Sequence, residues 1–235
     1  MNIENIYTND FPELKFSLEQ ALELEQFREM DYYAVENYYL PIELMMENAG
    51  LHLARLTATI SRPGSTIKIG VGNGNNGGGG LVAARRLASW GYKVFVDPFV
   101  EITKPLPKTQ LQRALEFGAL QKSVKNPDVW IDAYLGFSQK LPLAPELLQR
   151  IENANKGSSI NISLDIPTGF SGERNTFTFK ASKVLTLAAP KKILFHLPAQ
   201  IDVLVADIGI PAEVYKKFEI NSPPFYQNSI IQLKR

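Results

Sequence analysis

The spacing of hydrophobic positions changes near residue 66 and separates two kinds of predicted element. Before this point apolar residues recur at helical spacing, which predicts a helix over residues 18–37, with Ser17 and Gln20 forming a capping box, and a second helix from Pro41 to about residue 60. After it, short apolar runs alternate with helical stretches. The predicted strands are residues 66–71, 93–96, 129–133, 160–164, 184–188 and 203–206, and the predicted helices are residues 81–90, 106–117 and 145–155.

This alternation of short strands and helices predicts an α/β fold in three α/β/α layers, with a mostly parallel central sheet and two helices before its first strand. The chain shows no internal repeat and no linker, and its 235 residues suit one core. We therefore expect a single domain over residues 1–235. In sheets of this kind ligands bind at the carboxyl ends of the strands, so candidate chemistry is sought there.

Composition narrows the classes of function. Apolar residues are 45% of the chain and basic residues number 25 against 24 acidic ones, so the protein is globular and lacks the surplus of positive charge that nucleic acids require. There is no cysteine, and the two histidines are His52 and His196, which excludes disulfides and thiolate chemistry and argues against a multi-histidine metal site. Residues 1–10 are polar and no segment approaches the roughly 20 apolar residues of a membrane span. We expect a cytoplasmic protein with no membrane partner.

A glycine-rich segment follows the first predicted strand. Residues 72–80 read GNGNNGGGG, and such a backbone can adopt positive φ and approach a ligand closely. Amides at the start of the next helix can bind a phosphate, although neither the Walker loop nor the G-x-G-x-x-G fingerprint is present. We expect a phosphate-binding loop, the alternative being a flexible turn. The side-chain oxygens of Asn75 and Asn76 suit a monovalent cation or the hydroxyls of a ligand.

Two acidic residues end neighbouring predicted strands. Asp132 closes the apolar run WID, and Asp165 follows SL and precedes the turn sequence IPTG. Carboxylates brought together at one sheet edge repel each other unless a cation or a shared proton lies between them. They could hold an ion, bind ribose hydroxyls or transfer a proton. For Asp132 a role as a helix cap or turn former is the alternative.

Six short motifs resemble those of the NAD(P)HX epimerase family, also called the YjeF N-terminal domain family. They run in family order over residues 17–211, and together they are specific although each alone is modest. The motifs are MENAG at 46–50, GNNGG at 74–78 followed by GLVAAR at 80–85, DA at 132–133 with GFS at 136–138, DIPTG at 165–169, APKK at 189–192 and DIGIP at 207–211.

The resemblance implies a Rossmann-like fold, a homodimer and an isomerase that interconverts the R and S forms of hydrated NADH and NADPH, without an attached dehydratase domain. It also implies a bound potassium ion, whose ligands would be Asn76, Asp132 and Thr168, with Thr168 standing where the family has serine. Asp165 is our candidate acid/base residue. The residues expected to contact the nucleotide are Asn75, Asn76, Gly77, Gly78, Gly79, Gly136, Phe137, Ser138 and Asp165.

One departure from the family bears on activity. Gly79 stands where the family loop has an aspartate, so a carboxylate is lost at the ligand loop. A catalytically degenerate nucleotide-binding or assembly module of the same fold is therefore the alternative function. A sugar or nucleoside kinase is disfavoured because no Walker loop is present. A lysine that many members place after the second strand is also missing, and Lys104 is the nearest candidate. Lys191 and Lys192 either face a phosphate or form a solvated loop pair.

Overall fold

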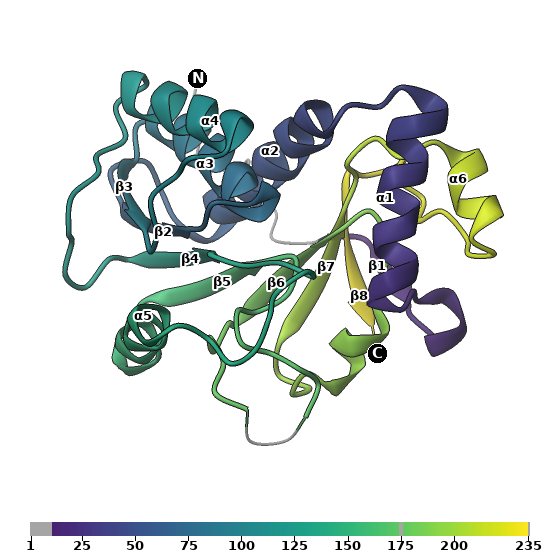
Figure 1. Ribbon diagram of the computed structural model, residues 1–235. Coiled ribbons are helices and arrows are strands. Elements are labelled where there is room, and N and C mark those ends of the chain that lie inside the picture. The colour runs from purple at the N-terminus through teal and green to yellow at the C-terminus, as the bar shows by residue number, and fades with distance from the viewer. Residues whose placement is uncertain (1–10, 174–175, 235) are drawn as a thin grey trace, which may run out of the picture.

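The computed structural model describes residues 11–173 and 176–234, and within them one sheet of eight strands forms the centre (Figure 1). Its order is β1-β8-β7-β6-β5-β4-β2-β3, and every neighbouring pair is parallel except β7 with β8. Residues 1–10, where the sequence predicts no signal peptide, lie outside the described residues. The strands are β1 (Glu13–Lys15), β2 (Thr66–Val71), β3 (Lys93–Pro98), β4 (Val129–Ala133), β5 (Ile160–Leu164), β6 (Lys183–Leu187), β7 (Asp202–Ala206) and β8 (Ile230–Lys234).

Helices cover both faces of the sheet, which confirms the three-layer prediction. In Figure 1, α2, α3 and α4 lie above the sheet and α5 lies below it, while α1 and α6 stand beside its β7–β8 end. Three apolar cores result among the described residues. One is shared by α2, α3 and the inward side chains of β2–β5, the second lies between α5 and the opposite face, and the third packs α1 against α6 and the start of α2. The helices are α1 (Leu24–Tyr38), α2 (Ile42–Ile60), α3 (Asn75–Ser89), α4 (Pro105–Glu116), α5 (Pro145–Lys156) and α6 (Ala212–Lys217). None of the described helices is long and apolar enough to cross a membrane.

The six predicted strands are all present, and three of them, β2, β4 and β5, have the predicted ends. The two strands that the sequence pattern did not predict are at the β1–β8 side of the sheet. β1 has three residues, and β8 is the strand that enters antiparallel, after the last βα-type repeat. The run of β1 is too short for its period to stand out, whereas β8 is as long as β4 and β5 but lies outside the alternation of strands and helices that guided the prediction.

The prediction of a first helix over residues 18–37 was wrong at its start. A single 3-10 turn covers Leu18–Gln20, and the α-helix begins only at Leu24. The capping box is formed by Glu23 and Gln26, since the Gln26 side chain accepts a hydrogen bond from the Glu23 amide at 3.0 Å. Between turn and helix, Leu22 forms a parallel bridge with Lys191. This long-range pairing holds the chain extended where local pattern favours helix.

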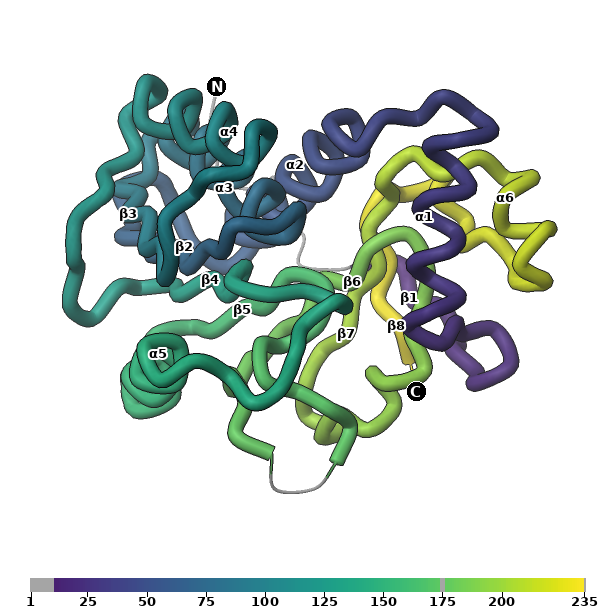
Figure 2. The backbone as a smooth tube through the Cα atoms, viewed as in Figure 1, coloured from purple at the N-terminus to yellow at the C-terminus, as the bar shows by residue number. Residues whose placement is uncertain are grey.

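The predicted glycine loop over residues 72–80 was also too long, because α3 begins at Asn75 and takes in the last four glycines. Figure 2 shows the tube of α3 running close beside α2. A Cβ on Gly78 would lie 2.5 Å from Met46 of α2, and one on Gly80 would lie 2.6 Å from the Ala133 Cβ. Glycine lowers helix propensity, but here its lack of a side chain permits close packing of helix on helix and on sheet.

Candidate functional site

A cavity of about 390 Å³ opens where the carboxyl ends of β2, β4 and β5 meet α1 and α2. The sheet side of its wall is made by residues 74–76 at the start of α3, by residues 134–139 after β4, and by Leu164 and Asp165 at the end of β5. α1 supplies the opposite wall, with Asp31 among its side chains. The three chain reversals singled out from the sequence therefore converge on one cavity.

Most residues expected to contact a nucleotide line this cavity. Two do not: a Cβ on Gly77 would meet the Gly72 carbonyl oxygen at 2.0 Å, and Gly78 faces Met46 of α2, so both serve packing in this structure. The predicted residues that line the cavity are Asn75, Asn76, Gly79, Gly136, Phe137, Ser138 and Asp165. Lys104 lines it as well, so the nearest lysine to the missing family position does reach the site.

Asp132 is completely buried and its carboxylate is satisfied by neutral donors. The Thr168 hydroxyl donates to Oδ1 at 2.6 Å and the Thr168 amide donates to Oδ2 at 2.8 Å. The Ser163 hydroxyl and the Tyr134 amide donate to the same carboxylate at 2.8 and 3.3 Å. Burial raises the pKa of Asp132 to about 6, and these hydrogen bonds oppose the rise. The group ties the end of β4 to the turn after β5.

Asn76 lies beside this cluster and joins the same two strands. Its Nδ2 donates to the Leu135 carbonyl at 2.8 Å and to the Leu164 carbonyl at 3.3 Å, and the Leu135 amide donates to the Thr168 hydroxyl at 3.2 Å. The amide, hydroxyl, carbonyl and carboxylate oxygens gathered here are hard donors, a set that fits a potassium ion. Among the described residues no three His, Cys, Asp or Glu side chains group as metal ligands.

Asp165 has a different environment, although it too is buried. Lys191 Nζ lies 2.8 Å from its Oδ1, and the Phe137 amide donates to its Oδ2 at 2.9 Å. Lys191 is itself fully buried: it donates to the Thr186 hydroxyl at 2.8 Å and its ammonium stands 3.6 Å from the centre of the Phe27 ring of α1. Burial lowers the pKa of Lys191, and Asp165 opposes that change. Asp165 thus lines the cavity, and the ammonium of Lys191 is buried behind it.

The sequence left two interpretations of Lys191 and Lys192 open, contact with a phosphate or a solvated loop pair, and the structure places the two residues differently. Lys192 is partly exposed and pairs with Glu23 at 3.1 Å. Lys191 is drawn inward because the bridge to Leu22 brings residue 191 beneath α1. The sequence could not indicate that Lys191 contacts a carboxylate and not solvent.

Asp31 is a polar residue of the cavity wall that was not predicted. Asp31 belongs to α1, four residues after buried Phe27, so it occupies the buried stripe of an amphipathic helix. An acid on such a stripe is the signal that could have revealed it. Gln139 accepts from the Gly169 amide at 2.7 Å and donates to the Phe170 carbonyl at 3.2 Å, which fixes the two loops to each other. Gln139 directly follows the predicted contact residues Gly136, Phe137 and Ser138 and lines the cavity with them.

Comparisons with known proteins agree on one family. A family model described as YjeF-related protein N-terminus matches residues 42–193. The NAD(P)H-hydrate epimerases of Rhodopirellula baltica and Dehalogenimonas lykanthroporepellens are 33% and 34% identical to the chain. The alignments cover 83% and 88% of this chain and 87% and 89% of those proteins. The fold of a yeast protein in a crystal structure superposes with a TM-score of 0.82 at 21% identity, over 91% of this chain and 99% of that one.

Proposed function

The chain belongs to the YjeF-related protein N-terminus family, and from this premise we propose that it is an NAD(P)H-hydrate epimerase, an isomerase that interconverts the R and S forms of hydrated NADH and NADPH. The observation that carries the proposal is Asp165, which lines the cavity and is paired with the ammonium of Lys191, buried behind it. Asp165 lines the same cavity as the start of α3, so a phosphate-binding group and a proton-transfer group share one site.

The start of α3 supports binding of the nucleotide phosphates. Gly74 is the N-cap and the helix runs for 15 residues, so its first amides and its dipole favour an anion at this end. Gly74, Asn75 and Asn76 all line the cavity. We propose that the phosphates lie here and that the loop at Gly136 and Phe137 covers the ring portion of the nucleotide.

The reaction requires a carbon to lose and regain an oxygen. C6 of the hydrated ring carries a hydroxyl and is bonded to N1. When the protonated hydroxyl leaves as water, the N1 electron pair forms a C6=N1 bond and the ring becomes cationic. We propose that the Asp165 carboxylate, held beside Lys191, stabilises this cation and accepts a proton from the water that adds to the other face. Addition to that face gives the other epimer.

We also propose that Asn76, Asp132 and Thr168 hold a potassium ion. Their contacts with Leu135 and Leu164 support this proposal, because the oxygens there belong to all three loops of the site. The ion, when bound, supplies positive charge that fixes these loops relative to one another. Cytoplasmic location and a homodimer stay predictions from the sequence.

The direct test uses purified protein and a preparation of NADHX enriched in one epimer. Proton NMR at C6 follows the approach to the equilibrium mixture, with boiled protein as the control for spontaneous mixing. We expect the native protein to shorten the mixing time by orders of magnitude at catalytic concentrations. Mixing at the rate of the boiled control, in protein shown to be folded by circular dichroism, would exclude this function.

Gly79 favours a second candidate function, a degenerate module that binds nucleotides without turning them over. Gly79 lines the cavity, and a Cβ there would lie 3.1 Å from Leu164 Cδ2, so an aspartate fits only if Leu164 yields slightly. The variant Gly79→Asp separates the two candidates. Activity confined to the variant would identify the natural chain as degenerate, whereas an active natural chain means that the lost carboxylate is dispensable.

A further inference from the structure

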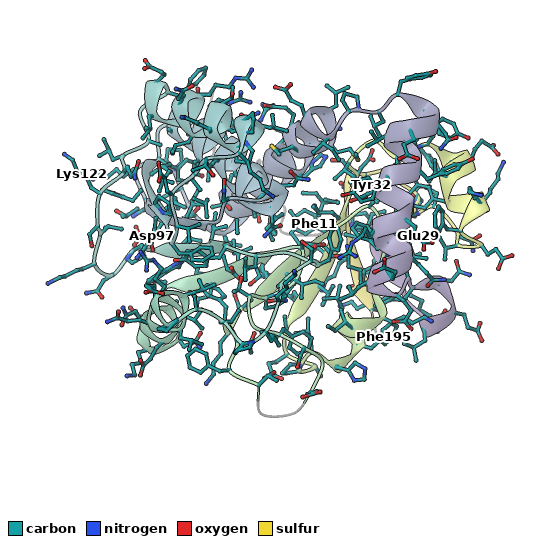
Figure 3. All side chains as sticks on the ribbon, in the orientation of Figure 1. Phe11, Glu29, Tyr32, Asp97, Lys122 and Phe195 are labelled. Atoms are coloured by element: carbon teal, nitrogen blue, oxygen red, sulfur yellow. The ribbon has the colours of Figure 1, made fainter. Side chains whose placement is uncertain are left out.

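Asp31 is the one carboxylate that α1 presents to the cavity. Phe27, Met30 and Ala34 form the buried stripe of this helix, and Asp31 stands on the same side between them. Figure 3 labels two neighbours of Asp31 on α1: Tyr32, which lines the cavity, and Glu29, which is exposed and does not.

The surroundings of Asp31 leave part of its carboxyl group unsatisfied. Its Oδ1 is shielded from solvent and has no hydrogen-bond partner among the described residues. Burial raises the pKa of Asp31 to about 7; Lys191 opposes the rise and Asp165 adds to it. The other charged groups that line the cavity are Arg28, on the same helix, and Lys104, before α4.

The charges of Asp31, Asp165 and Lys191 also indicate that one of the two carboxyl groups is protonated. Asp31 and Asp165 share one buried ammonium, that of Lys191, which already pairs directly with Asp165. Arg28 pairs with Glu25 and Lys104 is exposed, so neither offsets the charge within the buried group of Asp31, Asp165 and Lys191. Two ionised carboxylates would therefore leave this buried group with a net negative charge at low dielectric, which is costly. One proton held by the pair removes that excess. The two carboxyl groups have different partners, and such pairs divide the roles of acid and base.

We propose that Asp31 is the second acid/base group of the site and acts on the C6 oxygen from the α1 wall, on the ring face opposite to Asp165. This inference rests on the proposed epimerase function. It assigns one carboxyl group to each face, which inversion at C6 requires, because the leaving oxygen and the adding oxygen occupy opposite faces of the same planar carbon.

The step balances with water as the only other reactant. Neutral Asp31 gives its proton to the C6 hydroxyl; the C6–O bond breaks, its electron pair leaves with the oxygen as water, and the N1 pair forms the C6=N1 bond. A water on the opposite face then forms a new C6–O bond, the C6=N1 electrons return to N1, and Asp165 takes the released proton. The reverse reaction exchanges the two roles, so each direction needs one proton on the pair.

The test compares Asp31→Asn with Glu29→Gln, a matched loss of one carboxylate from the exposed side of the same helix. We expect kcat for epimerisation to fall by roughly 100-fold or more in Asp31→Asn, the usual contribution of a general acid. KM should change little, and Glu29→Gln should match the native protein. The native rate, corrected for spontaneous mixing, should fall as pH rises through about 7 as the shared proton is lost, and this fall should be absent from the residual activity of Asp31→Asn.

The results separate this inference from the function on which it rests. Native protein without epimerase activity overturns both. Active native protein together with an Asp31→Asn variant of unchanged kcat and unchanged pH profile overturns the role of Asp31 alone. Should Asp31→Asn not fold, Asp31→Glu is measured in its place. This variant retains a proton-carrying group, so it should keep activity and the fall in rate as pH rises. A native rate that is flat from pH 6 to 8 also overturns the proposal.

Discussion

Asp132 and Asp165 end neighbouring parallel strands, and the sequence pattern around them is the same, yet the structure gives them opposite surroundings. Asp132 accepts hydrogen bonds from neutral groups of Thr168, Ser163 and Tyr134. Asp165 meets a buried ammonium and faces a cavity. The first carboxylate joins two strands, whereas the second is available to a ligand. An acid at a strand end therefore indicates the site but not the role.

Backbone conformation explains the difference. Asp132 lies within β4, so the pleat directs its side chain across to Ser163 of β5. Asp165 is the first residue after β5 and has a φ of 71°, a left-handed conformation that aspartate adopts more readily than most residues. This turn aims the side chain at the Phe137 amide and at Lys191. Strain of this kind occurs where a site fixes a side chain against local preference.

The largest effect is expected from removing the charge of Asp165. Asp165→Asn keeps the shape of the side chain but loses the proton acceptor and the partner of Lys191. We expect kcat for epimerisation to fall by about 10²–10⁴-fold, as for loss of an acid/base group. NMR of the two epimers measures it. Asp202→Asn, which breaks the ion pair with Lys183 at the other edge of the sheet, is the control and should retain native activity.

Stability measurements test whether the ion pair is as isolated from water as its burial indicates. Removing one partner of a buried pair leaves the other charge unpaired and typically costs about 3–5 kcal/mol. We expect urea unfolding to show losses of that order for Asp165→Asn and for Lys191→Met. The double variant should lose less than the two together, because no lone charge remains. Simple additivity would mean that solvent screens the pair and that Asp165 does not differ from Asp132 in the way described.

Much of the fold could be predicted because most strands are marked by a local sequence pattern. β2, β4 and β5 are short apolar runs bounded by turn residues, and their ends were predicted correctly. The start of α1 and the start of α3 were not. At the first, pairing of Leu22 with Lys191 overrides a helical pattern; at the second, close packing on Met46 and Ala133 keeps glycines in a helix. Both depend on contacts between residues distant in the chain.

The same division between local pattern and long-range contact applies to the residues of the site. Strand-end position predicted that Asn76, Asp132 and Asp165 would gather, because parallel strands bring their carboxyl ends to one edge. It did not predict Asp31 in the cavity wall or Lys191 as the partner of Asp165, since α1 and the loop after β6 reach these positions only through tertiary packing. The distinction between a neutral and a cationic partner for an aspartate depends on those same elements. It therefore emerges only once the chain is folded.

A smaller effect is expected at the Asp132 cluster. In Thr168→Val the side chain keeps its shape but loses the hydroxyl that donates to Asp132 and accepts from the Leu135 amide. An unsatisfied buried group costs about 1–3 kcal/mol, and we expect urea unfolding to show a loss in this range. Thr109→Val on α4, whose hydroxyl bonds only to the Pro105 carbonyl at an exposed position, should change stability by less than about 0.5 kcal/mol. An equal loss in both variants would show that the buried hydrogen bonds of Asp132 contribute no more to stability than the exposed hydrogen bond of Thr109.

The smallest effect concerns the potassium ion, and it depends on the same oxygens. A ligand that binds only the folded state at ten times its Kd stabilises that state by about 1.4 kcal/mol. For a protein of this size such a gain corresponds to a rise in Tm of about 3–6 °C. We expect thermal melts in KCl to exceed those in NaCl at equal ionic strength by up to this amount, and Thr168→Val to abolish the difference while Thr109→Val preserves it. Equal melting in the two salts would argue that the donors around Asp132 already complete the cluster. In that case Asp132 joins the strands through hydrogen bonds alone, and of the two aspartates only Asp165 has a cationic partner.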